Sequence, residues 1–340
     1  MKSSFSFQFL NSPFEDSALL AVQNNSKDDL LFDLGDLGRT STGQMLRVRW
    51  VLITHTHIDH FAGFPRFLRV VLSSGKKKLS FYGPSGFIEN FSCALHAYQW
   101  NLIDEFDIVF EVFEVNEKEV SRALFDSKKG FEKEYKEAFV PNHQVLLETE
   151  NFLVSYEILD HKTPVLGFRL EEKEKWAVDK EKLLQENLCP GSWIKEIKNK
   201  IENSFDQDQG TLIENADKKW TLKEWKEKIF IKKEGNVFTY LTDFRYDELN
   251  RLKAVRLADH ARKLFIESNF LREEEKNAFE TAHLTAFQAG EIAGEAKVQE
   301  VRLFHFSNRY KNREELFKQF YDEMNEGRAS RWISEEKKSL

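Results

Sequence analysis

The stretch "VLITHTHIDH", residues 51–60, places three histidines and an aspartate within six positions, directly after an apolar run. The whole chain contains nine histidines, so a third of them lie in this one loop. The preceding "WVLIT" (50–54) is continuous, apolar and rich in β-branched residues, which is typical of a strand buried on both faces. We therefore expect the loop to begin where a buried strand ends.

The spacing within this loop favours metal binding. Side chains alternate across a strand, so His55 and His57 point the same way, and Asp59 and His60 follow in the turn. Neutral imidazole nitrogens suit zinc, and a carboxylate supplies charge and an oxygen ligand. The loop therefore offers ligands to two metal ions.

Four more polar residues lie at predicted strand ends or before a helix. His161 lies in "YEILDHKTPVLGF", Asp243 ends "NVFTYLTD", His283 lies in "TAHLTAFQAG" and His305 ends "VRLFHF". A lone histidine is more often a core or surface residue than a ligand, but four such residues in this order after the histidine loop favour a shared site, so these four join the candidate site. Three other histidines lie in helical or polar-loop contexts and are predicted to have no part in it: His96, His143 and His260.

Composition limits the class of protein. The chain has 340 residues with 41% hydrophobic residues, enough for one large domain or a domain with an insertion. The net charge of −7 lacks the basic surplus of a typical nucleic-acid binder. An anionic substrate would therefore need a local positive patch or metal. Two cysteines, a poor signal peptide and no long apolar run predict a cytoplasmic protein without membrane contact.

Strands and helices alternate through the first half of the chain, which predicts an α/β layered fold. From about 105 to 170 the pattern changes to strands. The stretch 171–234 is crowded with Lys and Glu and carries a "CPGSW" turn, so it is predicted to be an inserted arm in a single domain spanning 1–340. The simpler interpretation is that this stretch is a solvent-exposed helical segment, here called a solvated helical excursion.

The motifs resemble those of the metallo-β-lactamase superfamily, and in detail those of its ribonuclease Z branch. "LITHTHIDHFAGFPRFL" resembles the histidine motif of that branch, with Gly63 in the matching place. Further similar segments follow in the family's order: "LSFYGPSG", "LDHKTPVLGFRL", "YLTDFR", "FIESNF", "AHLTAFQAGEIAGEAKV" and "FHFSNRY". The resemblance runs from about residue 28 to 320 and implies a four-layer αββα sandwich with an inserted arm.

The resemblance also implies the roles of individual residues. Seven metal ligands are divided between two zinc ions, with Mn²⁺ or Fe²⁺ as alternatives: His55, His57 and His161 for one ion, Asp59, His60 and His305 for the other, and Asp243 as the bridge. Asp59 would orient the attacking hydroxide or accept its proton. His283 would protonate the leaving oxygen, and Glu267 would orient His283.

Departures from the family pattern lie at the expected pocket wall. Ile266 replaces a histidine of the family, Ser268-Asn269 replaces a small Thr-bearing end, and Phe244 and Leu284 alter two further motifs. These changes concern the substrate more than the chemistry. The arm lies where ribonuclease Z carries the protrusion that grips tRNA, although its acids balance its bases.

The leading hypothesis is a zinc-dependent phosphodiesterase that removes the 3′ trailer from precursor tRNA by means of a metal-bridged hydroxide, with 171–234 as a substrate-binding exosite. The resemblance also implies a homodimer. The first alternative is a dinuclear metal phosphodiesterase acting on a small or cyclic nucleotide, which the acidic pI and altered motifs favour. A binding protein with a vestigial site is less favoured because the ligand set is complete.

Overall fold

The computed structural model describes residues 3–24, 26–73, 75, 78–102, 105–203, 212–215, 218–310 and 313–336. The chain divides into two compact units, residues 1–171 with 237–340, here called the core unit, and residues 172–236, here called the arm unit. Among the described residues, no helix has the length and hydropathy needed to cross a bilayer.

Two β-sheets form the centre of the core unit. The first has eight strands in the order of the chain: β1 (Phe5–Phe9), β2 (Leu19–Gln23), β3 (Asp29–Phe32), β4 (Val48–Leu52), β5 (Lys78–Pro84), β6 (Val109–Val115), β7 (Val120–Asp126) and β8 (Lys133–Phe139). The second has six strands, in the order β18 (Glu300–Phe304), β17 (Lys263–Glu267), β16 (Val237–Leu241), β11 (Pro164–Glu172), β10 (Phe152–Asp160) and β9 (Val145–Glu148).

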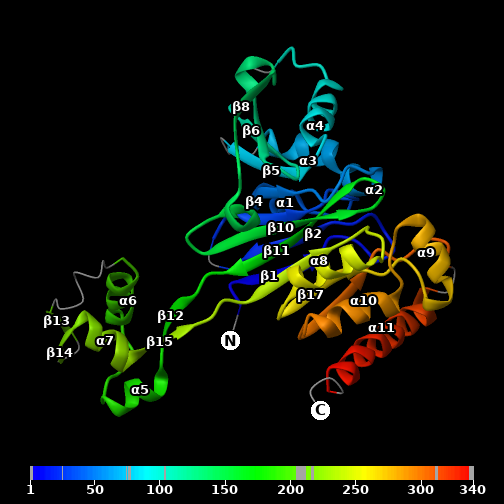
Figure 1. Ribbon diagram of the computed structural model, residues 1–340. Helices are drawn as coiled ribbons and strands as arrows, with labels where there is room; N and C mark the ends of the chain where they lie inside the picture. Colours follow the sequence, from blue (N-terminus) through cyan, green and yellow to red (C-terminus); the bar gives the residue numbers. More distant parts are fainter. Residues whose placement is uncertain are drawn as a thin grey trace. The chain divides into compact units, whose positions relative to one another are not determined.

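Helices cover the outer faces of both sheets (Figure 1). On the first sheet these are α1 (Thr42–Arg47), α2 (Ile58–Phe61), α3 (Phe64–Val71) and α4 (Phe87–His96). On the second they are α8 (Glu248–Ala258), α9 (Glu275–Thr281), α10 (Ala286–Glu295) and α11 (Arg313–Glu336). Short 3₁₀ turns occupy Ser127–Lys129, Asn142–Gln144 and Arg272–Glu274. The predicted four-layer αββα sandwich is confirmed.

Aromatic rings fill the space between the sheets. Phe7 of the first sheet packs against Phe238 and Phe265 of the second, with ring centroids 4.5 and 5.0 Å apart. Tyr240 lies 5.1 Å from Phe304 in a stacked arrangement. Such rings bury large apolar areas in defined geometries, and further phenylalanines, among them Phe64, Phe81 and Phe91, lie in a separate core beneath the helices of the first sheet.

On the outer face of the second sheet, α10 and α11 pack closely. A Cβ atom at Gly290 would lie 2.0 Å from the carbonyl oxygen of Met324. No side chain fits there, so the small residues of α10 set the distance between the two helices.

Within the strand-rich region 105–170, three strands were not identified individually from sequence: β7, β8 and β9. Strand β8 has the sequence KEYKEAF and lies at the edge of its sheet, where its charged side chains are half-buried or exposed. Charged side chains on an edge strand discourage pairing with other chains, and they also remove the apolar alternation by which a strand is recognised.

The arm unit has its own hydrophobic core. Its elements are β12 (Lys175–Val178), α5 (Lys180–Gln185), α6 (Trp193–Asn203), β13 (Leu212–Asn215), β14 (Lys218–Thr221), α7 (Leu222–Ile229) and β15 (Phe230–Lys233). Trp225 is fully buried among Leu183, Ile197 and Ile229, and its indole nitrogen donates to the carbonyl oxygen of Ile213. A solvated helical excursion is therefore the wrong description of this segment.

Parallel pairing determines where polar side chains meet. Strands β3 to β6 are parallel to one another, and so are β16, β17 and β18. Their carboxyl ends carry the loops in which parallel sheets place their ligands. The loop after β4 also joins the two sheets, since the backbone nitrogen of Leu166 donates to the oxygen of Thr54 over 2.9 Å.

Candidate metal centre

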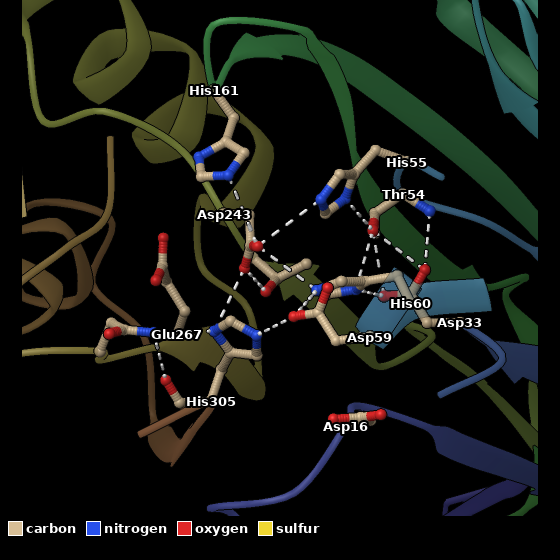
Figure 2. A network of polar contacts seen from close by, with 12 residues as sticks. Asp16, Asp33, Thr54, His55, Asp59, His60, His161, Asp243, Glu267 and His305 are labelled. Carbon is tan, nitrogen blue, oxygen red and sulfur yellow. Dashed lines mark hydrogen bonds and ion pairs between the residues drawn. The ribbon is translucent and has the colours of Figure 1, made fainter. Parts of the chain in front are cut away.

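Polar side chains from both sheets converge at this edge (Figure 2). The loop after β4 contributes His55, His57, Asp59 and His60, and the turn between β10 and β11 contributes His161. Asp243 follows β16, Glu267 ends β17 and His305 follows β18. The structure thus brings together the seven residues predicted as ligands, while their metal-binding roles stay a prediction. His96, His143 and His260 are exposed and lie outside this cluster.

One group of donors consists of His55, His57, His161 and Asp243, whose ligand atoms all lie within 4.8 Å of one another. The Nε2 atoms of His55 and His161 lie 3.6 and 3.8 Å from Oδ2 of Asp243. The rings of His55 and His57 are 4.4 Å apart between centroids. This group matches the first predicted ligand set.

A second group consists of Asp59, His60, Asp243 and His305, again within 4.8 Å. The Nε2 atom of His60 lies 3.3 Å from Oδ2 of Asp243 and 3.5 Å from Oδ2 of Asp59. Nδ1 of His305 lies 3.3 Å from Oδ1 of Asp243. Asp243 belongs to both groups, and its two oxygens face different histidines.

These separations fit shared cations better than direct hydrogen bonds. Ligands about 2.0–2.1 Å from a tetrahedral metal lie about 3.3–3.4 Å from one another, close to the spacings around Asp243. The Nε2 atoms of His55 and His60 are buried and have no hydrogen-bond partner among the described residues. A buried imidazole nitrogen without a partner is costly, and a metal ion would satisfy both.

The electrostatics of the cluster also favour bound cations. Burial lowers the pKa of His55 well below its ordinary value, and the charge of His60 lowers it further, so His55 is held neutral. Burial alone would raise the pKa of Asp243, but the charges of His305 and His60 hold it well below its usual range. Neutral imidazoles and an ionised carboxylate are the forms that bind metal.

A buried carboxylate behind the cluster, Asp33, orients His60. Oδ2 of Asp33 lies 2.9 Å from Nδ1 of His60 and accepts a hydrogen bond from the hydroxyl of Tyr240 over 3.0 Å. Oδ1 accepts from the backbone nitrogen of Thr54 over 2.8 Å. A carboxylate can only accept, so Nδ1 of His60 carries a proton. Burial alone would lower the pKa of His60, but the charges of Asp243 and Asp33 raise it well above its ordinary value, so metal-free His60 is protonated and a metal ion at Nε2 would replace the second proton.

Asp33 and Tyr240 were not predicted from sequence, although Asp33 follows a buried strand directly, which is the same signal that identified Asp243.

His283 and Glu267 form a pair at one side of the cluster. Nδ1 of His283 lies 2.9 Å from Oε2 of Glu267, whose other oxygen accepts from the backbone nitrogen of Phe244 over 3.0 Å. Burial alone would lower the pKa of His283, but the carboxylate of Glu267 raises it to about 9. His283 is therefore a cation at neutral pH and has a proton to give.

Asn269, at the predicted pocket wall, contacts His305. Its side-chain nitrogen donates to the carbonyl oxygen of His305 over 3.1 Å and lies 3.2 Å from Nδ1 of the same residue. The substitution of the family's Thr-bearing end therefore reaches a candidate ligand as well as the wall.

Three residues of the site have a left-handed backbone. The φ angles are 58° at Asp33, 50° at Asp243 and 60° at His305, each just after a strand. This conformation turns the side chain out of the strand's alternation and toward the cluster. It is uncommon for residues other than glycine and is concentrated at functional sites.

Comparisons with known proteins agree with this geometry. No family model matches the chain. Among solved structures, the metallo-β-lactamase fold protein YhfI from Bacillus subtilis aligns with a TM-score of 0.52 and 14% identity, over 92% of this chain and 90% of that one. The short form of human tRNase Z aligns with a TM-score of 0.51 and 17% identity, over 90% and 93%.

The structural likenesses show the metallo-β-lactamase fold, and the cluster offers groups that could hold metal ions. Among curated proteins, the chain is 28% identical over 306 residues to Ribonuclease Z of Deinococcus radiodurans, covering 89% of this chain and 90% of that protein. It is 29% identical over 290 residues to Ribonuclease Z of Oceanobacillus iheyensis, covering 82% and 79%. The predicted resemblance to the ribonuclease Z branch is confirmed.

Proposed function

We propose that this protein is a zinc-dependent endonuclease that removes the 3′ trailer from precursor tRNA. The observation that carries the proposal is the sharing of Asp243 between two groups of donors, with the His283–Glu267 pair beside them. Relatives named Ribonuclease Z that match about 90% of the chain support the choice of RNA as substrate. Precursor tRNA as partner, a homodimer and a cytoplasmic location stay predictions.

The seven ligands have the donor types and spacing that two zinc ions require. His55, His57 and His161 would hold one ion and Asp59, His60 and His305 the other, with Asp243 between them. Bound there, divalent cations supply Lewis-acid activation of water and neutralise charge on the phosphate.

His283 would then protonate the leaving oxygen. Its Nδ1 is held by Glu267, so Nε2 carries the transferable proton, and the fixed carboxylate keeps the ring charged until transfer. Oδ2 of Asp59 lies 3.2 Å from Nε2 of His305, within hydrogen-bonding distance. Burial alone would raise the pKa of Asp59, but His305 and His60 hold it well below its usual range, so Asp59 is an ionised acceptor that can orient water.

The arm unit supports an RNA substrate through one basic groove. A cavity of about 540 Å³ is lined by Trp176, by Lys182, Lys223, Lys226 and Lys232, and by one acid, Glu227. Nζ of Lys226 lies 4.7 Å from the centre of the half-buried Trp176 ring. Lysines contact phosphates, so we propose this groove, in which lysines outnumber acids, as the exosite surface within 171–234.

The test is cleavage of a 3′-extended precursor tRNA by the zinc-loaded protein, with the product ends mapped. A variant that lacks the arm can be closed with an Asn-Gly turn, because Glu171 pairs directly with Val237 in neighbouring antiparallel strands. A single cut near the discriminator base, lost without the arm while bis(4-nitrophenyl) phosphate is still hydrolysed, supports the proposal. Hydrolysis of small diesters by both proteins, without any tRNA cleavage, would move the function to a small or cyclic nucleotide.

The metal assignment has its own test. Asp59→Ala and His60→Ala should each lose one metal ion and nearly all hydrolysis, whereas exposed His260→Ala should keep both. A variant of Asp59 or His60 that retains two metals and a near-normal rate would contradict a dinuclear centre.

A further inference from the structure

A cavity of about 500 Å³ opens beside the metal centre in the core unit. Its lining comes from residues 14–16, 35–38, the start of α3 and Asn308. Ala62 and Gly63 line it and follow His60 almost directly in the chain, so the cavity adjoins the candidate ligands. The segment 35–38 and the segment that precedes α3 are in backbone contact, since a Cβ at Gly63 would lie 2.2 Å from the carbonyl oxygen of Gly35.

Asp16 lines this cavity, and its carboxylate is near enough to Asp59, His60 and His305 for their charges to act on it. Its carboxylate has no hydrogen bond or ion pair within the described ranges of the chain. Burial raises the pKa of Asp16, and the nearby carboxylates of Asp59 and Asp36 raise it further. Figure 2 shows Asp16 on a different side of the cluster from Glu267, and therefore away from the proposed proton donor, His283.

Arg66 supplies a cation in the same cavity. It is exposed on α3, and its guanidinium donates to the carbonyl oxygen of Thr40 over 3.2 Å; it has no carboxylate partner among the described residues. The other acids of the lining already have donors: Glu15 accepts from Arg39 over 3.1 Å, and Asp36 accepts from the backbone nitrogen of Gly38 over 2.7 Å. One acceptor and one cation are thus left for a ligand.

These two groups match the two ends of a nucleotide. A carboxylate accepts hydrogen bonds from ribose hydroxyls or from amino groups of a base, and a guanidinium binds a phosphate through paired hydrogen bonds. The volume is within the range of small-ligand sites.

We propose that the cavity binds the nucleotide that keeps the cleaved phosphate, with Asp16 accepting from its ribose or base and Arg66 holding the phosphate on its far side. This inference rests on the proposed function, because it takes His283 as the donor to the leaving oxygen. In that reaction a water gives one proton to Asp59 or to solvent while its oxygen forms the new bond to phosphorus, the bond to the leaving oxygen breaks, and that oxygen takes the proton of His283. The nucleotide on the opposite side, toward Asp16, retains the phosphate.

The probe is a nucleoside 3′,5′-bisphosphate, which carries one phosphate for the metals and one for Arg66. Binding to the zinc-loaded full-length protein is measured by calorimetry and compared with that of the two monophosphates and inorganic phosphate. We expect the bisphosphate to bind about tenfold more tightly than either monophosphate. Arg66→Ala should remove this advantage. Asp16→Asn should weaken the binding of all three nucleotides relative to the binding of inorganic phosphate.

Arg69→Ala is the matched control, because Arg69 lies one turn along the same helix and outside the cavity lining. It should keep the bisphosphate advantage. Equal affinities for bisphosphate and monophosphates in the unsubstituted protein, or an advantage that persists in Arg66→Ala, would overturn the inference. Failure of the proposed function is separate: it appears as absent tRNA cleavage, whatever the bisphosphate binding.

Discussion

Replacing Asp33 by Asn tests whether the buried carboxylate sets the proton on His60. The amide keeps one oxygen, which should stay on the backbone nitrogen of Thr54 because that donor is fixed, 2.8 Å away. Its NH₂ group then faces Nδ1 of His60 and the hydroxyl of Tyr240. To accept from the amide, His60 must move its proton to Nε2, where it blocks the lone pair meant for metal.

Two magnitudes follow from these contacts. Hydrogen bonds to a charged group are each worth about 1.5–3 kcal/mol, so losing those of His60 and Tyr240 should lower the free energy of unfolding by about 3–6 kcal/mol. Changing the residue that orients a ligand typically costs about 10–100-fold in metal affinity. We expect that loss in the Asp59–His60–His305 group, with the other group less affected.

The assay is zinc titration against a chromogenic chelator, together with urea unfolding of the metal-free protein. Asp29→Asn is the control, because Asp29 is equally buried at the start of β3 and binds Arg47 over 2.7 and 2.9 Å, away from the cluster. Asp29→Asn should lower the free energy of unfolding and leave the zinc affinities of both groups unchanged. If Asp33→Asn also kept both, the orienting role of Asp33 would be wrong.

Three further outcomes are expected. Gly290→Ala should destabilise the protein by about 1–3 kcal/mol in thermal or urea unfolding, because the new methyl meets the backbone of α11; an unchanged midpoint would contradict that packing. The pKa of His283 is raised to about 9 by Glu267, so the pair stabilises metal-free protein fully below about pH 6.5 and loses this effect as pH rises through 9; Glu267→Gln should flatten that part of the stability–pH curve, and an identical curve would refute the pairing. Zinc at a thousandfold excess over Kd should raise the free energy of unfolding by about 4 kcal/mol, reversed by a chelator; no shift in melting temperature would argue against a structural effect of the metals.

The ligand positions were predictable from sequence because the evidence for them is local. The histidines of residues 55–60 lie within one loop, and Asp243 and His305 each follow a recognisable strand. Asp33 and Tyr240 were not predictable in the same way, because their hydrogen bond joins residues 207 positions apart. Nothing near Asp33 in the sequence indicates which donors the folded sheets will bring to it.

The arm unit shows a second limit of sequence patterns. Its apolar residues are distributed among short strands and helices and separated by Lys and Glu, so no segment shows a long apolar stripe. Their burial around Trp225 depends on how the elements close on one another. Acids and bases are nearly balanced in this segment, but that balance does not distinguish a solvated helix from a small domain.

The left-handed residues at the strand ends also bear on how such a site persists under mutation. Apart from glycine, the side chains most tolerant of that backbone are Asn, Asp and His, and two of these are among the commonest ligands of zinc. At Asp243 and His305 the chain geometry and the proposed metal ions would therefore favour overlapping residue types. On that assignment, most substitutions carry two penalties, one in the apoprotein and one in metal binding. A left-handed Asp or His directly after a buried strand can accordingly serve as a search criterion for metal sites in proteins where no ion has been observed.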